Sequence, residues 1–310
     1  MTKINSPIII FTYRRIIEKT IKSLLNNNLA SKSDLYIFSD GYKSEIDKSD
    51  VLAVREYLKT ISGFKSVNMI ESEKNKGLAN SIISGVSHVV EKYGKVIVVE
   101  DDLIVSSNFL EYMNEALSFY NDDNRIWSIS GYSPNLLCLK DFNDDIYFSV
   151  RSSSWGWATW KNRWNSIDWD VSDFEQFKND KQSIIQFNQG GNDLFKMLEL
   201  QVLNKIDSWA IRWCYAQYKN NSYAVFPKES KVINDGFSDG IGTHNSGVDE
   251  RWVTVLSDKK VIFCKLYVDK TILECFRKFH NLKLSTRIGY WLKKNGGYAL
   301  AKKFRNFFIR

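Results

Sequence analysis

The chain has 310 residues, of which 44% are hydrophobic and 25% are charged, the composition of an ordinary globular protein with room for one or two cores. The net charge of +7 is unevenly placed: residues 271–310 hold ten Lys and Arg against one acid, which leaves about −2 on residues 1–270. A nearly neutral body argues against a nucleic-acid-binding face. We therefore expect no nucleic-acid partner and a local attachment element in residues 271–310.

Other features of the sequence indicate the cellular compartment and exclude some classes of protein. No run of about 18 apolar residues occurs, so no helix is expected to span a membrane, and residues 1–7 lack the apolar core of a signal peptide. The four cysteines are scattered, without a C-x-x-C pair, which favours a reduced, cytosolic protein. Neither a G-x-G-x-x-G after the first strand nor a P-loop signature is present, so a dinucleotide fold and a P-loop NTPase are not expected.

Residues 1–130 alternate short apolar runs with amphipathic segments. Strands are predicted at residues 8–11, 35–38, 67–70 and 96–99, and helices at residues 15–25, 51–58, 77–93 and 108–120. This alternation predicts βαβ units, and hence an α/β fold with a mainly parallel central sheet flanked by helices. After residue 130 the pattern changes: glycine and aromatic residues gather at 152–160, residues 172–206 favour helix, and residues 228–250 are a glycine-rich loop region.

Three acids, Glu100, Asp101 and Asp102, directly follow the fourth predicted strand. Open α/β sheets bind ligands at the carboxyl ends of their strands, and crowded carboxylates need a cation beside them. Carboxylate oxygens suit Mg²⁺ or Mn²⁺, and these ions suit a diphosphate. Arg14 and Arg15, just past the first strand, are candidates for holding the phosphates. A solvated acidic turn is the alternative, and the buried strand before the triplet argues against it.

Several further motifs keep a fixed order over residues 7–250. They are Tyr13-Arg14, Ser39-Asp40-Gly41, the acidic triplet, Trp155-Gly156-Trp157, Asp207-Ser208-Trp209 and Gly240-Ile241-Gly242-Thr243-His244. Together they resemble nucleotide-sugar-dependent glycosyltransferases of the GT-A fold, and in particular the N-acetylglucosaminyltransferase I family. The segment Asn75 to Asn80 is similar instead to the large bacterial inverting (family 2-like) group, so the chain shares features with both.

The resemblance implies a role for each motif. It assigns a divalent ion, Mn²⁺ or Mg²⁺, to Asp102 and acceptor binding to the Trp155-Gly156-Trp157 loop. Trp155 and Trp157 could stack on a sugar ring, or they could be packing residues under that loop. Contacts with the nucleotide-sugar donor are expected from Thr12, Arg14, Asp40, Lys76, Glu100, Asp101 and His244.

The resemblance also places a catalytic carboxylate at Asp207. We expect this residue to remove the proton from the acceptor hydroxyl in a direct displacement, which inverts the anomeric carbon. Asp207 could instead cap the helix that follows it. The family has tandem acids where this chain has Asp207-Ser208, which defines the position of the base only to within one residue. Separately, Asp168 and Asp170 stay open as alternative bases.

The prediction for the whole chain has three parts. Residues 1–130 form the donor-binding half, residues 131–265 the acceptor-binding and catalytic half of the same GT-A domain, and residues 266–310 a basic aromatic tail. The expected reaction moves a hexose or N-acetylhexosamine from a UDP-linked donor to a saccharide or lipid-linked saccharide in bacterial surface polysaccharide synthesis. Basic and aromatic side chains in residues 271–310 suit an anionic membrane surface, so we expect a cytoplasmic protein, peripheral on the inner face of the cell membrane.

Two other classes of protein stay open. A sugar nucleotidyltransferase would share the sheet and the metal ion, but it should carry a glycine-rich loop after the first strand, and residues 11–15 contain no glycine. A non-catalytic carbohydrate-binding protein could keep the same fold without the chemistry.

Overall fold

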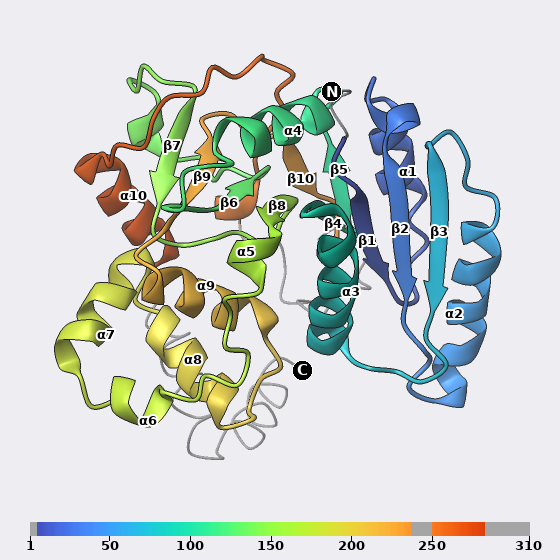
Figure 1. Cartoon of the computed structure of the whole chain (residues 1–310), viewed down its shortest axis with the longest axis horizontal. Coiled ribbons are helices and arrows are strands. Elements are labelled where there is room, and N and C mark those ends of the chain that lie inside the picture. Colours follow the sequence, from blue (N-terminus) through green and yellow to red (C-terminus); the bar gives the residue numbers. More distant parts are fainter. Residues whose placement is uncertain (1–4, 237–249, 283–310) are drawn as a thin grey trace, which may run out of the picture.

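The computed structural model describes residues 5–236 and 250–282. Its centre is an eight-stranded sheet with the strand order β3-β2-β1-β4-β8-β6-β9-β7 (Figure 1). The strands are β1 (Ile8–Thr12), β2 (Asp34–Ser39), β3 (Ser66–Glu71), β4 (Lys95–Glu100), β6 (Ile126–Ser130), β7 (Ile146–Ser149), β8 (Trp157–Trp160) and β9 (Tyr223–Pro227). A separate antiparallel ribbon pairs β5 (Leu103–Val105) with β10 (Val232–Asn234).

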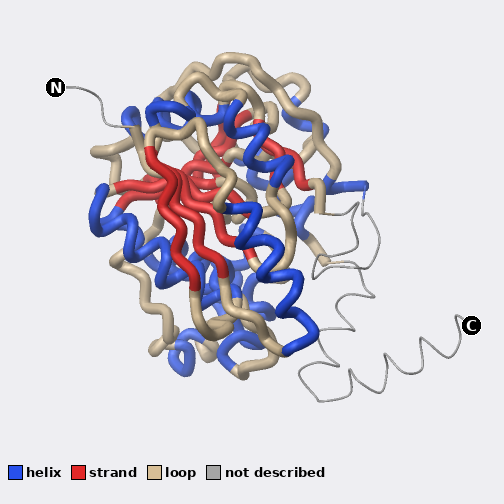
Figure 2. Tube along the Cα trace, turned by 90° about the vertical axis from the view of Figure 1, so that its right-hand side faces the viewer, coloured by secondary structure: helices blue, strands red, loops and turns tan. Residues whose placement is uncertain are grey.

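Helices surround this sheet, as Figure 2 shows with strands in red and helices in blue. The described residues include the helices α1 (Glu18–Leu25), α2 (Glu45–Leu58), α3 (Leu78–Tyr93), α4 (Phe109–Phe119), α5 (Lys161–Trp164), α6 (Phe174–Phe177), α7 (Lys181–Phe187), α8 (Leu194–Val202), α9 (Trp209–Lys219) and α10 (Lys270–His280). No helix in the described residues is both long and apolar enough to cross a bilayer.

Strands β3, β2, β1 and β4 run parallel, and helices connect them along the chain. On the other side of β4 the directions are mixed: β8 runs antiparallel to β4 and β6, β9 runs parallel to β6, and β7 closes the edge antiparallel to β9. The predicted α/β fold with a mainly parallel sheet is confirmed. The sheet also continues across residue 130, because β4 and β8 are direct neighbours.

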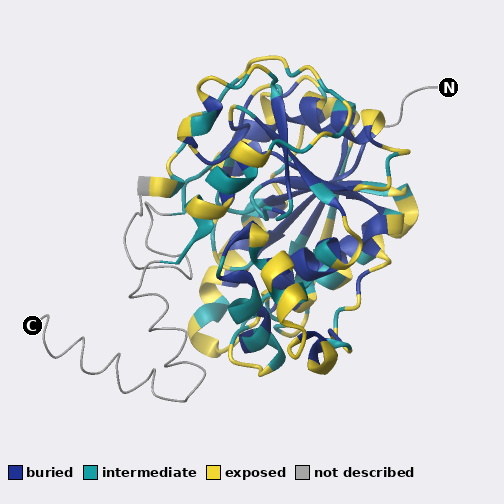
Figure 3. Cartoon of the chain, turned by 90° about the vertical axis from the view of Figure 1, so that its left-hand side faces the viewer, coloured by how far each residue is buried: buried dark blue, intermediate teal, exposed yellow. Residues whose placement is uncertain are grey.

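The core has two layers because successive strand residues face opposite sides of the sheet. Ile8 and Ile10 of β1 pack with residues of α1, α2 and α4, whereas Ile9 and Phe11 pack with residues of α3 and α9. The strands of the sheet lie in the buried interior of the molecule, and the exposed segments lie around them (Figure 3). Burying an aliphatic or aromatic side chain fully contributes roughly 1.5–3 kcal/mol, so the alternation fixes the strand register.

Helix α10 packs on the body of the protein. Its Ile272 and Phe276 are buried and cluster with Tyr147 of β7 and Phe226 of β9. Asp269 caps the helix by accepting hydrogen bonds from the backbone N–H groups of Thr271 and Ile272. Phe276, one of the aromatic residues expected at a membrane, is therefore occupied inside the protein, and residues 283–310 of the predicted tail lie outside the described residues.

The last residue of α10, His280, stays neutral in the folded protein. Its ring stacks on Phe276 at 4.4 Å, and Nδ1–H donates to the Phe276 carbonyl oxygen over 2.9 Å. Burial lowers the pKa of His280 to about 3, and the nearby Arg151 and Arg251 lower it further, while Asp193 acts in the opposite direction.

The stability of the protein should consequently fall in mild acid. An unfolded histidine titrates near pH 6.5, so between pH 6.5 and 3 the unfolded chain binds a proton that folded His280 does not. This costs about 1.4 kcal/mol per pH unit, or roughly 2 kcal/mol between pH 6.5 and 5. Urea unfolding at pH 7 and pH 5 measures the loss. We expect His280→Gln to reduce it by that amount and the exposed His88→Gln to leave it unchanged; equal losses in both variants would contradict the assignment.

Candidate active site

Strand β4 ends at Glu100, and the chain turns through Asp101 and Asp102 into β5. The guanidinium of Arg15 lies against this turn, with Nη1 at 3.2 Å from Asp102 Oδ2 and 3.4 Å from Asp101 Oδ1. The other oxygen of Asp102, Oδ1, is buried and has no hydrogen-bond partner among the described residues. A buried carboxylate oxygen without a partner is costly, so Asp102 is suited to a ligand that supplies positive charge.

Backbone contacts fix the position of the triplet. Thr20 of α1 donates from Oγ1 to the Asp101 carbonyl oxygen (3.1 Å), and Asp235 N–H donates to the Asp102 carbonyl oxygen (2.8 Å). Gly236 follows directly, and a Cβ there would come within 2.4 Å of Asp102 Oδ2. A side chain at residue 236 would therefore have to displace the Asp102 carboxylate.

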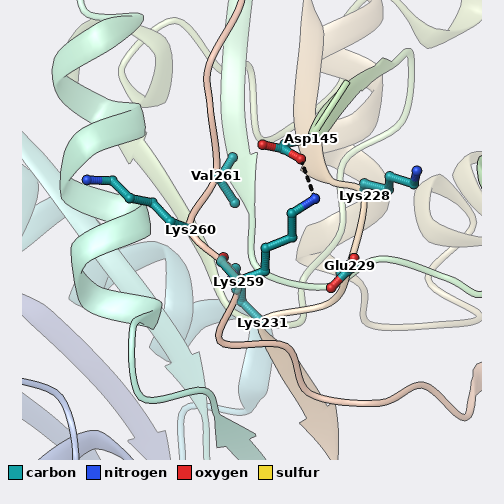
Figure 4. Close-up of a pocket in the computed structure, with 7 residues that line it drawn as sticks. All are labelled: Asp145, Lys228, Glu229, Lys231, Lys259, Lys260 and Val261. Carbon is teal, nitrogen blue, oxygen red and sulfur yellow. Dashed lines mark hydrogen bonds and ion pairs between the residues drawn. The ribbon is translucent and has the colours of Figure 1, made fainter. Parts of the chain in front are cut away.

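A buried lysine anchors the start of the β10 segment. Lys231 precedes β10, and its Nζ donates to Asn108 Oδ1 and to the carbonyl oxygens of Ser257 and Lys259. Burial lowers the pKa of Lys231 to about 8, although nearby acids act in the opposite direction. Figure 4 shows Lys231 beside Lys259, whose own ammonium pairs with Asp145 at 2.8 Å. Lys231 thereby fixes the segment that carries Gly236 to the acidic triplet.

The residues present fit a divalent ion bound together with a diphosphate. In residues 5–236 and 250–282 no three His, Cys, Asp or Glu side chains gather into a group able to hold a metal ion. Mg²⁺-type ions in nucleotide sites commonly take one or two protein carboxylates, with phosphate oxygens and water as the other ligands. Asp102 supplies a suitable oxygen, and its neighbour Asp101 lies on the same turn. His244, expected to contact the donor, lies outside the described residues.

Glu100 differs from the two aspartates that follow it. Burial raises the pKa of Glu100 well above its usual range, the charges of Asp102 and Asp101 raise it further, and a hydrogen bond with Ser154 acts in the opposite direction. This environment favours the protonated carboxyl group, which can donate a hydrogen bond as well as accept one.

The loop after β1 places its two arginines in different surroundings. Arg14 pairs with Asp47 of α2 at 2.9 Å, and 44% of its side chain is exposed. Arg15 contacts the acidic triplet instead, and only 12% of its side chain is exposed. Thr12 is buried, and its Oγ1 donates to the Arg15 carbonyl oxygen over 3.1 Å. The structure thus brings Arg15 to the triplet, whereas Arg14, the arginine assigned to the donor from the sequence, contacts α2.

The end of β2 is joined to the loop before α3 by Asp40. Its Oδ1 accepts from the N–H groups of Gly41 (2.9 Å) and Lys76 (2.8 Å), and its Oδ2 accepts from Gly77 N–H (3.0 Å). Gly77 has φ of +78°, a conformation that suits glycine. Asp40 thereby orders this loop, and the Lys76 side chain is exposed. A contact between Asp40 and the nucleotide base stays a prediction.

Asp207 lies beside the same loop. A Cβ placed on Gly77 would be 3.5 Å from Asp207 Oδ2, and the Asp207 side chain is exposed. The cap of α9 is the next residue, Ser208, whose Oγ accepts from Ile211 N–H. Asp207 is therefore not the residue that caps α9. The alternative base Asp168 accepts from both the N–H and the hydroxyl group of Ser172, at 2.7 and 2.6 Å.

The two tryptophans of the 155–157 loop have different roles. Trp157 is only 1% exposed and packs against Trp209 and Trp213 in the core, so of the two roles left open for it, packing is the one that fits. Trp155 is half-buried and packs edge-on against Tyr132 at 4.6 Å. Gly156, between them, has φ of +60°, which suits glycine. Of the pair, Trp155 is the one left with an accessible surface.

The parallel strands β3, β2, β1 and β4, with the acidic triplet directly after β4, form the α/β arrangement predicted from the sequence for a GT-A type domain. The model of the GNT-I family matches residues 3–180, more than half of the chain. The chain belongs to the GNT-I family. The resemblance inferred from the ordered motifs is confirmed.

No curated protein matches the chain. The solved structures similar to it include the glycosyltransferase GlyE of Streptococcus pneumoniae TIGR4, with 13% identity over 71% of this chain and a TM-score of 0.35. The galactosyltransferase LgtC is 13% identical over 56% of this chain and 65% of its own chain, with a TM-score of 0.33. UDP-glucose pyrophosphorylase is 10% identical over 76% of this chain and 95% of its own chain, with a TM-score of 0.38. The match spans 45% of the length of GlyE.

Proposed function

We propose that this glycosyltransferase moves a hexose or N-acetylhexosamine from a UDP-linked donor to a saccharide acceptor, with Mn²⁺ or Mg²⁺ held at Asp102. The observation that carries the proposal is the buried Oδ1 of Asp102, which has no hydrogen-bond partner in the part of the chain that the structure describes and lies on the carboxyl group that contacts the guanidinium of Arg15. Sugar transfer leaves a nucleoside diphosphate, and this corner of the sheet offers both a ligand for a cation and a cation for the phosphates.

The donor side of the mechanism follows from the triplet. A divalent ion bound there supplies positive charge to the leaving diphosphate. Asp102 would hold the ion, Asp101 would support that ligand, and Glu100 would hydrogen-bond the donor's ribose or sugar. Thr12, Arg14, Asp40, Lys76 and His244 remain further candidates for donor contacts from the surrounding loops.

On the acceptor side, Asp207 is the proposed general base. Its carboxylate is exposed beside Gly77, so an acceptor hydroxyl can reach it without disturbing the core. Removal of the proton as the hydroxyl attacks gives a single displacement, which inverts the anomeric carbon. Trp155 is the proposed contact with a sugar ring, and its partial exposure supports this role. The acceptor we propose is a saccharide or lipid-linked saccharide of a bacterial surface polysaccharide.

Binding of the donor tests the proposal. We expect UDP and a matching UDP-sugar to raise the melting temperature of the protein by several degrees with Mn²⁺ present, because a ligand that binds only the folded state stabilises it. The same nucleotides with a chelator should give a much smaller shift. Equal shifts with and without the chelator would contradict the metal site. Formation of pyrophosphate from UTP and a sugar phosphate would identify a nucleotidyltransferase instead.

We also propose that the C-terminal segment attaches the enzyme to the cytoplasmic face of a membrane. Residues 283–310 contain eight Lys and Arg and no acid, and each such residue near an anionic surface contributes about 1 kcal/mol. The full chain should float with phosphatidylserine vesicles, and a chain ending at Leu282, which keeps α10, should not. Equal flotation of the two chains would contradict this attachment.

A further inference from the structure

We propose that Arg15 is a positioning residue that holds Asp102 before the donor binds and exchanges it for the diphosphate when metal ion and nucleotide arrive together. Binding of the metal ion then depends on the nucleotide. The inference rests on the proposed function, because it assumes that Asp102 is the metal ligand.

The topology of the sheet brings the two groups together. Strands β1 and β4 are parallel neighbours, with Phe11 opposite Glu100. Arg15 therefore lies a few residues beyond the end of β1, beside the triplet that ends β4. Arg15 Nη1 lies 3.2 Å from Asp102 and 3.4 Å from Asp101, and its side chain is little exposed. The contact between Arg15 and the triplet is therefore part of the packed structure.

A metal ion and the guanidinium compete for one carboxylate. Arg15 contacts Oδ2 of Asp102, and the available oxygen is Oδ1 of the same group, so an ion at Oδ1 would lie within a few ångströms of the guanidinium. Two cations so close repel strongly where burial limits screening by water. A metal ion that arrives alone brings no anion for Arg15 and must bear this repulsion.

A metal ion that binds together with a diphosphate brings an anionic partner for Arg15. The phosphate oxygens are acceptors that a guanidinium binds in a bidentate manner, so Arg15 can leave Asp102 without losing an anionic partner. The ion and the nucleotide then favour each other's binding by the same factor, as thermodynamic linkage requires. The enzyme thus selects the metal–nucleotide complex over the free ion.

An arginine outside the candidate site provides the control. Arg125 carries the same charge, but its partner is Asp123 at 2.7 Å and 62% of its side chain is exposed. Replacing Arg125 removes one positive charge from the protein, as replacing Arg15 does, without altering the competition at Asp102.

Mn²⁺ binding to the full chain, followed by electron paramagnetic resonance of the free ion, tests the proposal. In the wild type we expect weak binding of Mn²⁺ alone and at least about tenfold tighter binding with saturating UDP. Arg15→Gln should bind Mn²⁺ alone at least about tenfold more tightly than the wild type, and UDP should enhance its binding less. Arg15→Lys, which keeps the charge, and Arg125→Gln should bind Mn²⁺ alone as the wild type does.

The possible outcomes separate this inference from the proposed function. If wild-type protein binds Mn²⁺ with UDP but Arg15→Gln gains no affinity for Mn²⁺ alone, the inference is overturned and the proposed metal site stands. If Arg15→Lys gains as much as Arg15→Gln, charge is not the cause and the inference also fails. If the wild type binds no Mn²⁺ in either condition, both the metal site and the inference are overturned. Circular dichroism identifies any variant that does not fold. Where one of the two Arg15 variants does not fold, the other Arg15 variant decides.

Discussion

Replacing Asp102 by Asn is expected to lower the rate of sugar transfer at least about 10³-fold, because a metal ion at a leaving group stabilises the transition state by several kcal/mol. The substitution keeps the size of the side chain and removes the charge that holds the ion. Dependence of the rate on Mn²⁺ should disappear together with the rate itself. Initial rates of UDP release, measured against Mn²⁺ concentration with a saturating donor, give both quantities.

The exposed Asp122, in the loop after α4, provides a control of the same chemistry. Asp122→Asn should keep the wild-type rate and its metal dependence. Arg15 loses an anionic partner in Asp102→Asn, so the thermal stability of this variant must be measured beside its rate. A folded Asp102→Asn enzyme that stays fully active in the presence of a chelator would rule out the metal assignment.

The fold of the first half could be predicted because its signals are local. Apolar runs mark β1, β2 and β4, whose residues are mostly buried, and the strand predicted at residues 67–70 corresponds to the less buried β3. Boundaries were less accurate: α2 begins at Glu45, six residues before the predicted start, because residues 45–50 carry many polar side chains and show no apolar stripe. A helix turn that faces water leaves no periodic pattern to detect.

The second half could not be predicted to the same extent, because its sheet is built from distant segments. Strand β8 has only four residues, Trp157–Trp160, and it lies between β4 and β6 through antiparallel pairing on both sides. Nothing in a short Trp-rich segment separates a buried strand from an acceptor loop. This is why Trp157 could be interpreted as a sugar-stacking residue although it lies in the core.

The candidate site shows the same division between local and non-local signals. The acidic triplet was evident from its place after a buried strand. Arg14 and Arg15 are equivalent in the sequence, and only the path of the backbone after Thr12 decides that Arg15 reaches Asp102 while Arg14 reaches Asp47. The ordering of the loop before α3 by Asp40 is likewise non-local, because its N–H donors include those of residues 76 and 77.

Replacing Asp207 by Asn should lower kcat by about 10²–10⁴-fold and leave the affinity for UDP and Mn²⁺ unchanged, because a general base acts on the acceptor and contributes mainly to the transition state. The exposed position of Asp207 means that little packing is lost, so the melting temperature should stay close to the wild-type value. Steady-state rates with varied acceptor, together with the Kd for UDP in the presence of Mn²⁺, provide the measurement.

Asp168→Asn provides the matched comparison, because Asp168 was an alternative base and is engaged by Ser172 in the structure. Losing the charge on those bonds should destabilise this variant by roughly 1–2 kcal/mol while the rate per folded molecule stays near that of the wild type. The reverse pattern, with a slow Asp168→Asn enzyme and a fast Asp207→Asn enzyme, would move the base to Asp168. Loss of UDP binding in Asp207→Asn with normal residual turnover would place Asp207 on the donor side, next to the loop that Asp40 orders.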